Sequence, residues 1–234
     1  MDEKVNPLNR TARFAGLLYL MLVIIFPFGL LYVPSQIMVS GDATTTANNL
    51  LANEFLFRTS VVGNLIAQVI FVLLVLVLYR LLKQVNEHQA KLMAALVIVG
   101  VPIAFIGDVF NISSLMILKG GILESTEPEQ MHDLVAILLK LGSYCTQMVQ
   151  LYWGLWLIPF GYLVYRSGFI PRILGVLLVL NGIAYIILCL TFLLLPDYQT
   201  IIVKIATPFL VLELPILLWL LIKGVKVKQE INEV

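Results

Sequence analysis

The sequence has few of the residues on which most enzyme and metal chemistry depends. It contains two cysteines and two histidines, and only 12% of its residues are charged. Cys145 and Cys189 both fall in apolar stretches and form no Cys-x-x-Cys motif, so we interpret them as buried free thiols. His88 and His132 stand at opposite ends of their segments, and neither an HExxH nor a GxSxG motif occurs. We therefore expect no metal site, no cofactor and no catalytic residue set.

Basic residues are scarce as well, and no block of Lys and Arg occurs. The formal net charge is +1, which leaves no basic stripe for phosphates and excludes nucleic acid as a partner. Apolar residues make up 60% of the chain, whereas soluble domains contain about 45–50%. The chain is therefore expected to be an integral membrane protein, with the lipid bilayer as its main partner.

Apolar stretches separated by turn signals predict an all-α bundle of six transmembrane helices. We expect one domain over residues 14–222, preceded by a cytoplasmic leader (residues 1–13) and followed by a basic cytoplasmic tail (residues 223–234). The fourth stretch is too long for one straight span at about 1.5 Å per residue, so it should project beyond the membrane. The predicted helices are Phe14–Val33, Glu54–Leu82, Leu92–Leu118, Glu127–Tyr165, Ile173–Leu195 and Ile201–Ile222.

Local signals mark the ends and bends of these helices. Asp42 should cap a short helix before the second span, and Thr126 with Glu129 forms a capping box before the fourth. Gly168 should close the fourth helix and Pro171 should open the fifth.

Prolines predict two distortions inside spans. Pro27 and Gly29 should bend the first helix, and Pro208 and Pro215 should break the sixth helix near Glu213.

Charges in the loops predict the orientation. Of the 15 Lys and Arg residues, all fall on one side of the predicted spans except Arg58, Lys119, Lys140 and Lys204. Because cytoplasmic loops carry an excess of Lys and Arg, both termini should lie in the cytoplasm.

Polar side chains inside the spans predict a pocket. On the fourth helix, Lys140, Ser143, Tyr144, Gln147 and Gln150 project within an arc of about 120°. Lipid offers no hydrogen bonds, so this face should line a polar pocket that opens to the outer side. Counting residues from the helix ends places the polar floor of this pocket between the midplane and the outer half of the membrane, and it places a cationic rim of Arg58, Lys140 and Lys204 a few turns further out. The predicted pocket residues are Arg58, Asn64, Gln68, Asp108, Asn111, Lys140, Tyr144, Gln147, Gln150 and Lys204.

Two acids inside spans need an explanation, because a carboxylate in lipid is costly unless it is paired or protonated. For Asp108 we expect either an ion pair with Lys140 or Arg58, or a role in binding. Glu213 lies at the depth of Asn181 on the preceding helix, and we expect these two to contact each other, directly or through one water, as a second intramembrane site. A protonated structural acid is the alternative for Glu213.

Several segments together resemble a known family. They are TARFAGLLYL, GDATTTANNLLANEFLFR, VLYRLLK, VPIAF and QLYWGLWLIPFGYLVYRSGFIPRILGVLLVLNGIAY. They are similar to a bacterial family of six-span membrane proteins catalogued as domain of unknown function 4386, from Asn9 to about Pro196. The resemblance implies a bacterial inner (plasma) membrane protein with one six-helix domain, and it implies no activity and no site residues.

Three functions stay open on the sequence alone. The first is binding or transport of a small polar or anionic solute, or of a lipid headgroup, with Asp108 or Glu213 carrying a coupling proton. The second is a non-catalytic membrane component that packs against a partner protein, and a homo-oligomer is a further alternative. The third is an intramembrane enzyme that uses Asp108, which the lack of a matched nucleophile disfavours.

Overall fold

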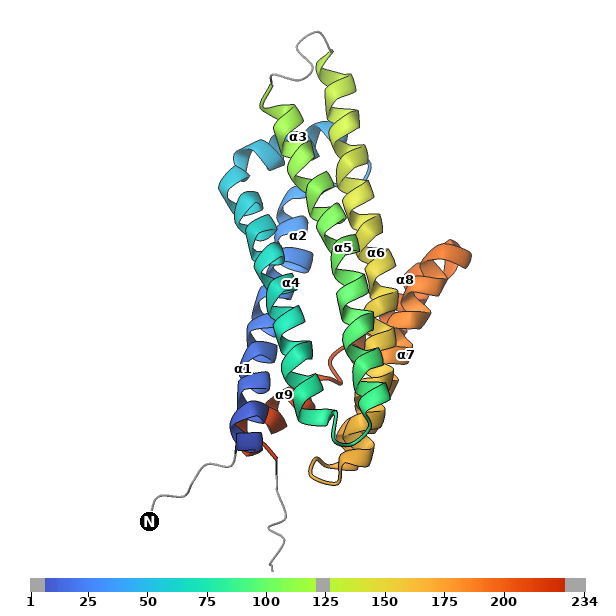
Figure 1. The fold of residues 1–234 in the computed structure, drawn as a ribbon. Helices are drawn as coiled ribbons and strands as arrows, with labels where there is room; N and C mark the ends of the chain where they lie inside the picture. Colours follow the sequence, from blue (N-terminus) through green and yellow to red (C-terminus); the bar gives the residue numbers. More distant parts are fainter. Residues whose placement is uncertain (1–6, 121–126, 226–234) are drawn as a thin grey trace, which may run out of the picture. The chain divides into compact units, whose positions relative to one another are not determined.

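The computed structural model describes residues 7–120 and 127–225, and within these residues every secondary-structure element is helical (Figure 1). The part of the chain described here contains 6 helical stretches that are long and apolar enough to cross a membrane. This confirms the predicted all-α fold with six candidate spans. The stretches are Leu8–Ile37, Glu54–Leu82, Glu87–Leu118, Pro128–Ser167, Arg172–Leu194 and Pro196–Lys223.

Two helices begin earlier than the apolar pattern predicts. Helix α1 (Pro7–Pro27) starts at Pro7, where a missing N–H costs nothing in the first turn. Helix α5 (Glu87–Leu118) starts at Glu87 because the Asn86 side chain accepts a hydrogen bond from the Gln89 backbone N–H at 3.0 Å. Helix α4 (Glu54–Leu82) has the predicted bounds.

The long fourth span and the turn after it follow the prediction closely. Helix α6 (Pro128–Ser167) has 40 residues, with Glu129 in its first turn, whereas Thr126 of the expected capping box lies outside the described residues. It ends before Gly168, whose φ of 71° is the left-handed conformation that glycine adopts without strain. Helix α7 (Arg172–Leu194) then begins directly after Pro171.

The first span changes its winding at the predicted bend. After Pro27 the chain forms a π-helix (Phe28–Tyr32) and then α2 (Val33–Ile37). The predicted cap at Asp42 is present: its carboxylate accepts the Thr45 N–H at 2.8 Å and the Thr45 hydroxyl at 2.6 Å at the start of α3 (Ala43–Ala52). These hydrogen bonds from Thr45 lower the pKa of the Asp42 carboxyl from its usual value.

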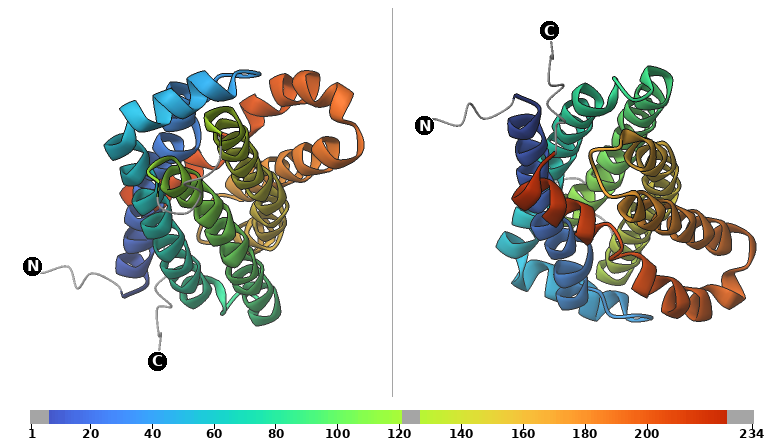
Figure 2. Two further views of the ribbon diagram at one scale, coloured as in Figure 1. Left: turned by 90° about the horizontal axis from the view of Figure 1, so that it is seen from above. Right: turned by 90° about the horizontal axis from the view of Figure 1, so that it is seen from below.

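The sixth span is broken, as its prolines predict. Two 3₁₀ turns (Pro196–Tyr198 and Thr207–Phe209) flank α8 (Gln199–Ala206), and residues 210–213 are not helical. Helix α9 (Leu214–Leu218) and a π-helix (Trp219–Lys223) complete the span. Figure 2 shows α8 and α9 running in different directions on the two sides of this break.

The contacts divide the chain into two compact units. The first unit holds residues 7–20, 71–98 and 150–225, and the second unit holds residues 21–70 and 99–149. In the first unit Trp156 is in ring contact with Tyr19, Phe71 and Phe160. In the second unit a buried apolar cluster joins α2, α3, α4, α5 and α6; its members are Val33, Ile37, Leu50, Phe57, Val61, Leu115, Val135 and Leu139.

Two pairs of glycines hold α6 and α7 together in the first unit. A Cβ on Gly154 would lie 2.5 Å from the carbonyl oxygen of Gly182, and a Cβ on Gly161 would lie 2.6 Å from that of Gly175. No side chain fits at such distances, so the two backbones touch directly. Small residues are what allow helices in a membrane to approach this closely.

We expect Gly154→Ala and Gly161→Ala each to lower the free energy of unfolding by about 1–3 kcal/mol, because the added methyl group has to push two backbones apart. Gly63→Ala is the matched control, since its Cβ would meet nothing closer than the Ile25 side chain at 3.5 Å. It should be neutral or stabilising by up to about 1 kcal/mol. Thermal unfolding in detergent measures all three, and equal loss in all three would contradict the backbone contact.

Candidate functional site

Asp108 on α5 is the buried acid at the centre of the second unit's polar side chains. It is 7% exposed, and one carboxylate oxygen accepts a hydrogen bond from the Asn64 amide of α4 at 3.2 Å. Asn111, one turn further along α5, is its second polar neighbour. The carboxylate is therefore stabilised by neutral amide donors.

The backbone around this acid is shaped to admit the amides. A Cβ on Gly29 would collide with the amide oxygen of Asn64, and a Cβ on Gly142 would lie 2.4 Å from that of Asn111. Gly29 belongs to the π-helix of the first span, and Gly142 belongs to α6. Both glycines are therefore needed for the Asn64 and Asn111 side chains to take their positions.

Two glutamines of the second unit lie near the level of Asp108. Gln68 is one turn from Asn64 on α4 and is 3% exposed. Helices α5 and α6 run side by side (Figure 1), and a Cβ on Gly107 would lie 3.1 Å from the Cβ of Cys145. Because Gly107 faces Cys145 across the two helices, we can count residues from this contact. At about 1.5 Å per residue, Gln147 on α6 and Asp108 on α5 are separated by about 5 Å or less along the helix axes. We call Asn64, Gln68, Asp108, Asn111 and Gln147 the second-unit cluster.

Several hydrogen-bond acceptors of the second-unit cluster are unfilled in the described structure. The amide oxygens of Asn64, Gln68 and Gln147 are buried and receive no hydrogen bond from the described residues. Buried polar atoms usually have a partner, and an unfilled acceptor costs about 1–3 kcal/mol. The cluster is therefore suited to a group that donates several hydrogen bonds.

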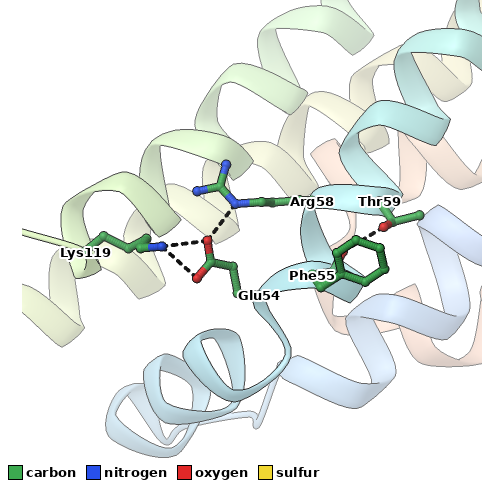
Figure 3. A network of polar contacts seen from close by, with 5 residues as sticks. All are labelled: Glu54, Phe55, Arg58, Thr59 and Lys119. Atoms are coloured by element: carbon green, nitrogen blue, oxygen red, sulfur yellow. Dashed lines mark hydrogen bonds and ion pairs between the residues drawn. The ribbon is translucent and has the colours of Figure 1, made fainter.

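The cations predicted to form the rim of the pocket do not pair with Asp108. Figure 3 shows Arg58 and Lys119 both directed at Glu54, with nitrogen–oxygen distances of 2.7 Å and 2.8 Å. Lys140 is exposed on α6, and its ammonium group lies 5.8 Å from the centre of the Tyr144 ring. The predicted ion pair of Asp108 with Arg58 or Lys140 is therefore wrong, because Arg58 has an acid one turn away on its own helix.

The remaining predicted pocket residues are distributed between the units. Gln150 and Lys204 belong to the first unit, so the cluster of the second unit does not include them. Gln150 also has a buried amide oxygen without a partner in the described residues, and Lys204 is exposed on α8.

The second predicted site lies at the break of the sixth span, in the first unit. Glu213 accepts a hydrogen bond from the hydroxyl of Tyr19 on α1. Asn181 on α7 is fully buried and donates its amide to the carbonyl oxygen of Leu210 at 3.5 Å. Among the described residues no direct hydrogen bond joins Asn181 to Glu213, and each has a partner of its own. A contact between them through one water stays a prediction.

Sequence reasoning missed three participants. Tyr19 and Trp219 lie in apolar spans, where an aromatic residue gives no signal of polar contact, and the indole N–H of Trp219 is buried without a partner in the described chain. Glu54 was missed although its spacing of four residues from Arg58 is a recognisable helix pair. Within residues 7–120 and 127–225, no three His, Cys, Asp or Glu side chains gather as a metal site would require.

Comparison with known proteins supplies a family. Residues 14–224 match the model of a family described as "Domain of unknown function (DUF4386)". No curated protein and no solved structure gave a match. The matched residues include all six candidate spans wholly or in large part, which agrees with the resemblance noted in the sequence. The chain is therefore a multi-pass membrane protein that belongs to the DUF4386 family.

Proposed function

We propose that the protein binds, and carries across the membrane, a small polar solute or lipid headgroup that bears a primary ammonium group. The proposed site is the second-unit cluster. The observation that carries the proposal is a buried acid, Asp108, with no cation paired to it in the described chain and with unfilled amide oxygens beside it.

A primary ammonium group fits both features of the cluster. Its positive charge offsets the cost of keeping the Asp108 carboxylate in a low-dielectric environment. Its three N–H donors can fill the amide oxygens of Gln68 and Gln147 together with the carboxylate. Each filled acceptor removes part of the desolvation cost that the protein carries alone.

An anionic solute is less well supported by the same contacts. It would have to approach a carboxylate and several amide oxygens, all of which repel negative charge. Arg58 and Lys119, which would attract it, both pair with Glu54, and this shared acid lowers their combined charge from +2 to +1.

We also propose the bacterial plasma membrane as the location, with both termini in the cytoplasm and the cluster reached from the outer side. The asymmetric distribution of Lys and Arg over the loops supports this orientation. The alternative, a non-catalytic component whose amides only hold helices together, would leave the cluster without a ligand. Such amide contacts contribute about 0.6 kcal/mol each on average.

The ligand class can be tested by thermal unfolding of the purified protein in detergent. Ethanolamine, with three N–H donors, should raise the melting temperature, whereas choline, with the same charge and no N–H, should not. Asp108→Asn should abolish the shift, and Asp133→Asn, which alters an exposed acid of α6, should retain it. A shift with inorganic phosphate and none with ethanolamine would favour an anionic solute instead.

The neutral environment of Asp108 predicts an unusual pattern of stability. Asp108→Asn should change the free energy of unfolding by less than about 1 kcal/mol, because no cation loses its partner. Asn64→Ala should cost more, about 1–3 kcal/mol, because the buried carboxylate then loses a donor. Chemical unfolding of both variants measures which of them loses more free energy of unfolding. A loss of about 3–5 kcal/mol in Asp108→Asn would reveal a buried ion pair after all.

The proposed orientation has its own test in whole cells. A single cysteine placed at Asp42 should react with a membrane-impermeant maleimide added outside, because the loop that ends in α3 is on the outer side in this proposal. A reporter fused after Val234 should be active in the cytoplasm. Protection of position 42 from the maleimide, with labelling only after the cells are opened, would reverse the orientation.

A further inference from the structure

The acid at the break of the sixth span has no counter-charge among the described residues. Glu213 is half-buried directly before α9, where its carboxylate accepts the Tyr19 hydroxyl. No Lys or Arg among the described residues forms an ion pair with it. Tyr19 on α1 and Tyr185 on α7 are the titratable groups that act on it. Both are neutral phenols, so a charged Glu213 needs a cation that the described side chains do not supply.

Oxygen atoms collect at the same break. Leu210 lies three residues before Glu213 in the non-helical segment 210–213, and its carbonyl oxygen accepts the amide of Asn181. The amide oxygen of Asn181 has no partner in the described chain, although the residue is 0% exposed. The side-chain amide nitrogen of Asn181 therefore holds the residue at the break, and its amide oxygen is available to bind a ligand.

The helix that ends at the break adds negative potential on that side, while the N-terminus of α9, directly after Glu213, adds positive potential on the other. The helical segment that starts at Gln199 and continues through the 3₁₀ turn to Phe209 has its carboxyl end at the break. Carbonyl groups at a helix C-terminus carry a partial negative charge of about half an electron. A cation at the break would thus face the helix end, the Leu210 carbonyl and the Glu213 carboxylate.

We propose that the break in the sixth span is a sodium-binding site, with Glu213, Asn181 and the Leu210 carbonyl as its ligands. Hard cations prefer carboxylate, amide and carbonyl oxygens, and transporters build sodium sites from unwound helices and half-helix ends. Sodium cancels the charge of Glu213 and fills the acceptor on Asn181 at once. Tyr19 acts as a positioning residue, because its hydroxyl occupies one carboxylate oxygen and leaves the other for the ion.

This site is independent of the ammonium site proposed above. All its residues belong to the first unit, whereas the second-unit cluster belongs to the other. Either proposal can fail without the other, and the probes differ, because one experiment varies sodium and the other varies organic ammonium compounds.

The test compares melting temperatures in sodium chloride and in choline chloride at equal ionic strength and pH 8. For the wild-type protein we expect sodium to raise the melting temperature by about 5–10 °C once its concentration reaches about 100 times its Kd. Glu213→Gln and Asn181→Leu should each abolish or strongly reduce the sodium shift. Glu54→Gln, an acid of the second unit that already has two cationic partners, is the matched control and should keep the shift.

Binding of radioactive sodium to the wild-type protein keeps the proposal testable if a variant fails to fold. We expect saturable binding that excess unlabelled sodium displaces and choline does not. Tyr19→Phe, which removes only the hydroxyl, should weaken this binding several-fold. The proposal is overturned if sodium and choline give the same melting temperature and no saturable binding is found. It is also overturned if the melting temperature changes with pH but not with sodium, since Glu213 would then bind only a proton.

Discussion

A chain inside a lipid bilayer must satisfy its own backbone hydrogen bonds, because hydrocarbon offers none. This constraint accounts for the uniformly helical character of the described residues, and it makes each interruption of a helix informative. Two spans depart from regular α-helix, the first over Phe28–Tyr32 and the sixth over residues 210–213. At both places a side-chain amide from another helix lies against the irregular backbone: Asn64 packs at Gly29, and Asn181 binds the carbonyl of Leu210.

The two acids inside the spans solve the same electrostatic problem in the same way. Asp108 is held by the amide of Asn64 and Glu213 by the hydroxyl of Tyr19, and in both cases the partner is neutral. A neutral donor lowers the cost of burial without cancelling the charge, so the acid keeps its capacity to attract a cation. A salt bridge would cancel the negative charge of the acid, as Arg58 and Lys119 do for Glu54 at the start of α4.

The fold was largely predictable from the sequence because its signals are local. The apolar run of α4, the cap at Asp42, the left-handed turn at Gly168 and the break near Pro208 each depend on residues within one or two turns. Polar partners were harder to predict. Depth along a helix can be counted, and it placed Asn64 near Asp108 correctly. Counting residues does not give the rotation of each helix about its axis. That rotation determines that Asp108 contacts Asn64, whereas Lys140 lies exposed beside Tyr144.

The glycines of α6 and α7 have a consequence for motion within the first unit. On each helix the two contact glycines are two turns apart, and each faces a glycine of the other helix. A screw motion of α7 by one residue would place Val176 and Ile183 where the glycines now meet a backbone that has no room for a side chain. Sliding is therefore blocked, and these two helices form a stiff hairpin. Any displacement within this unit must then be taken up by segments outside the hairpin, and the non-helical residues 210–213 are one such segment.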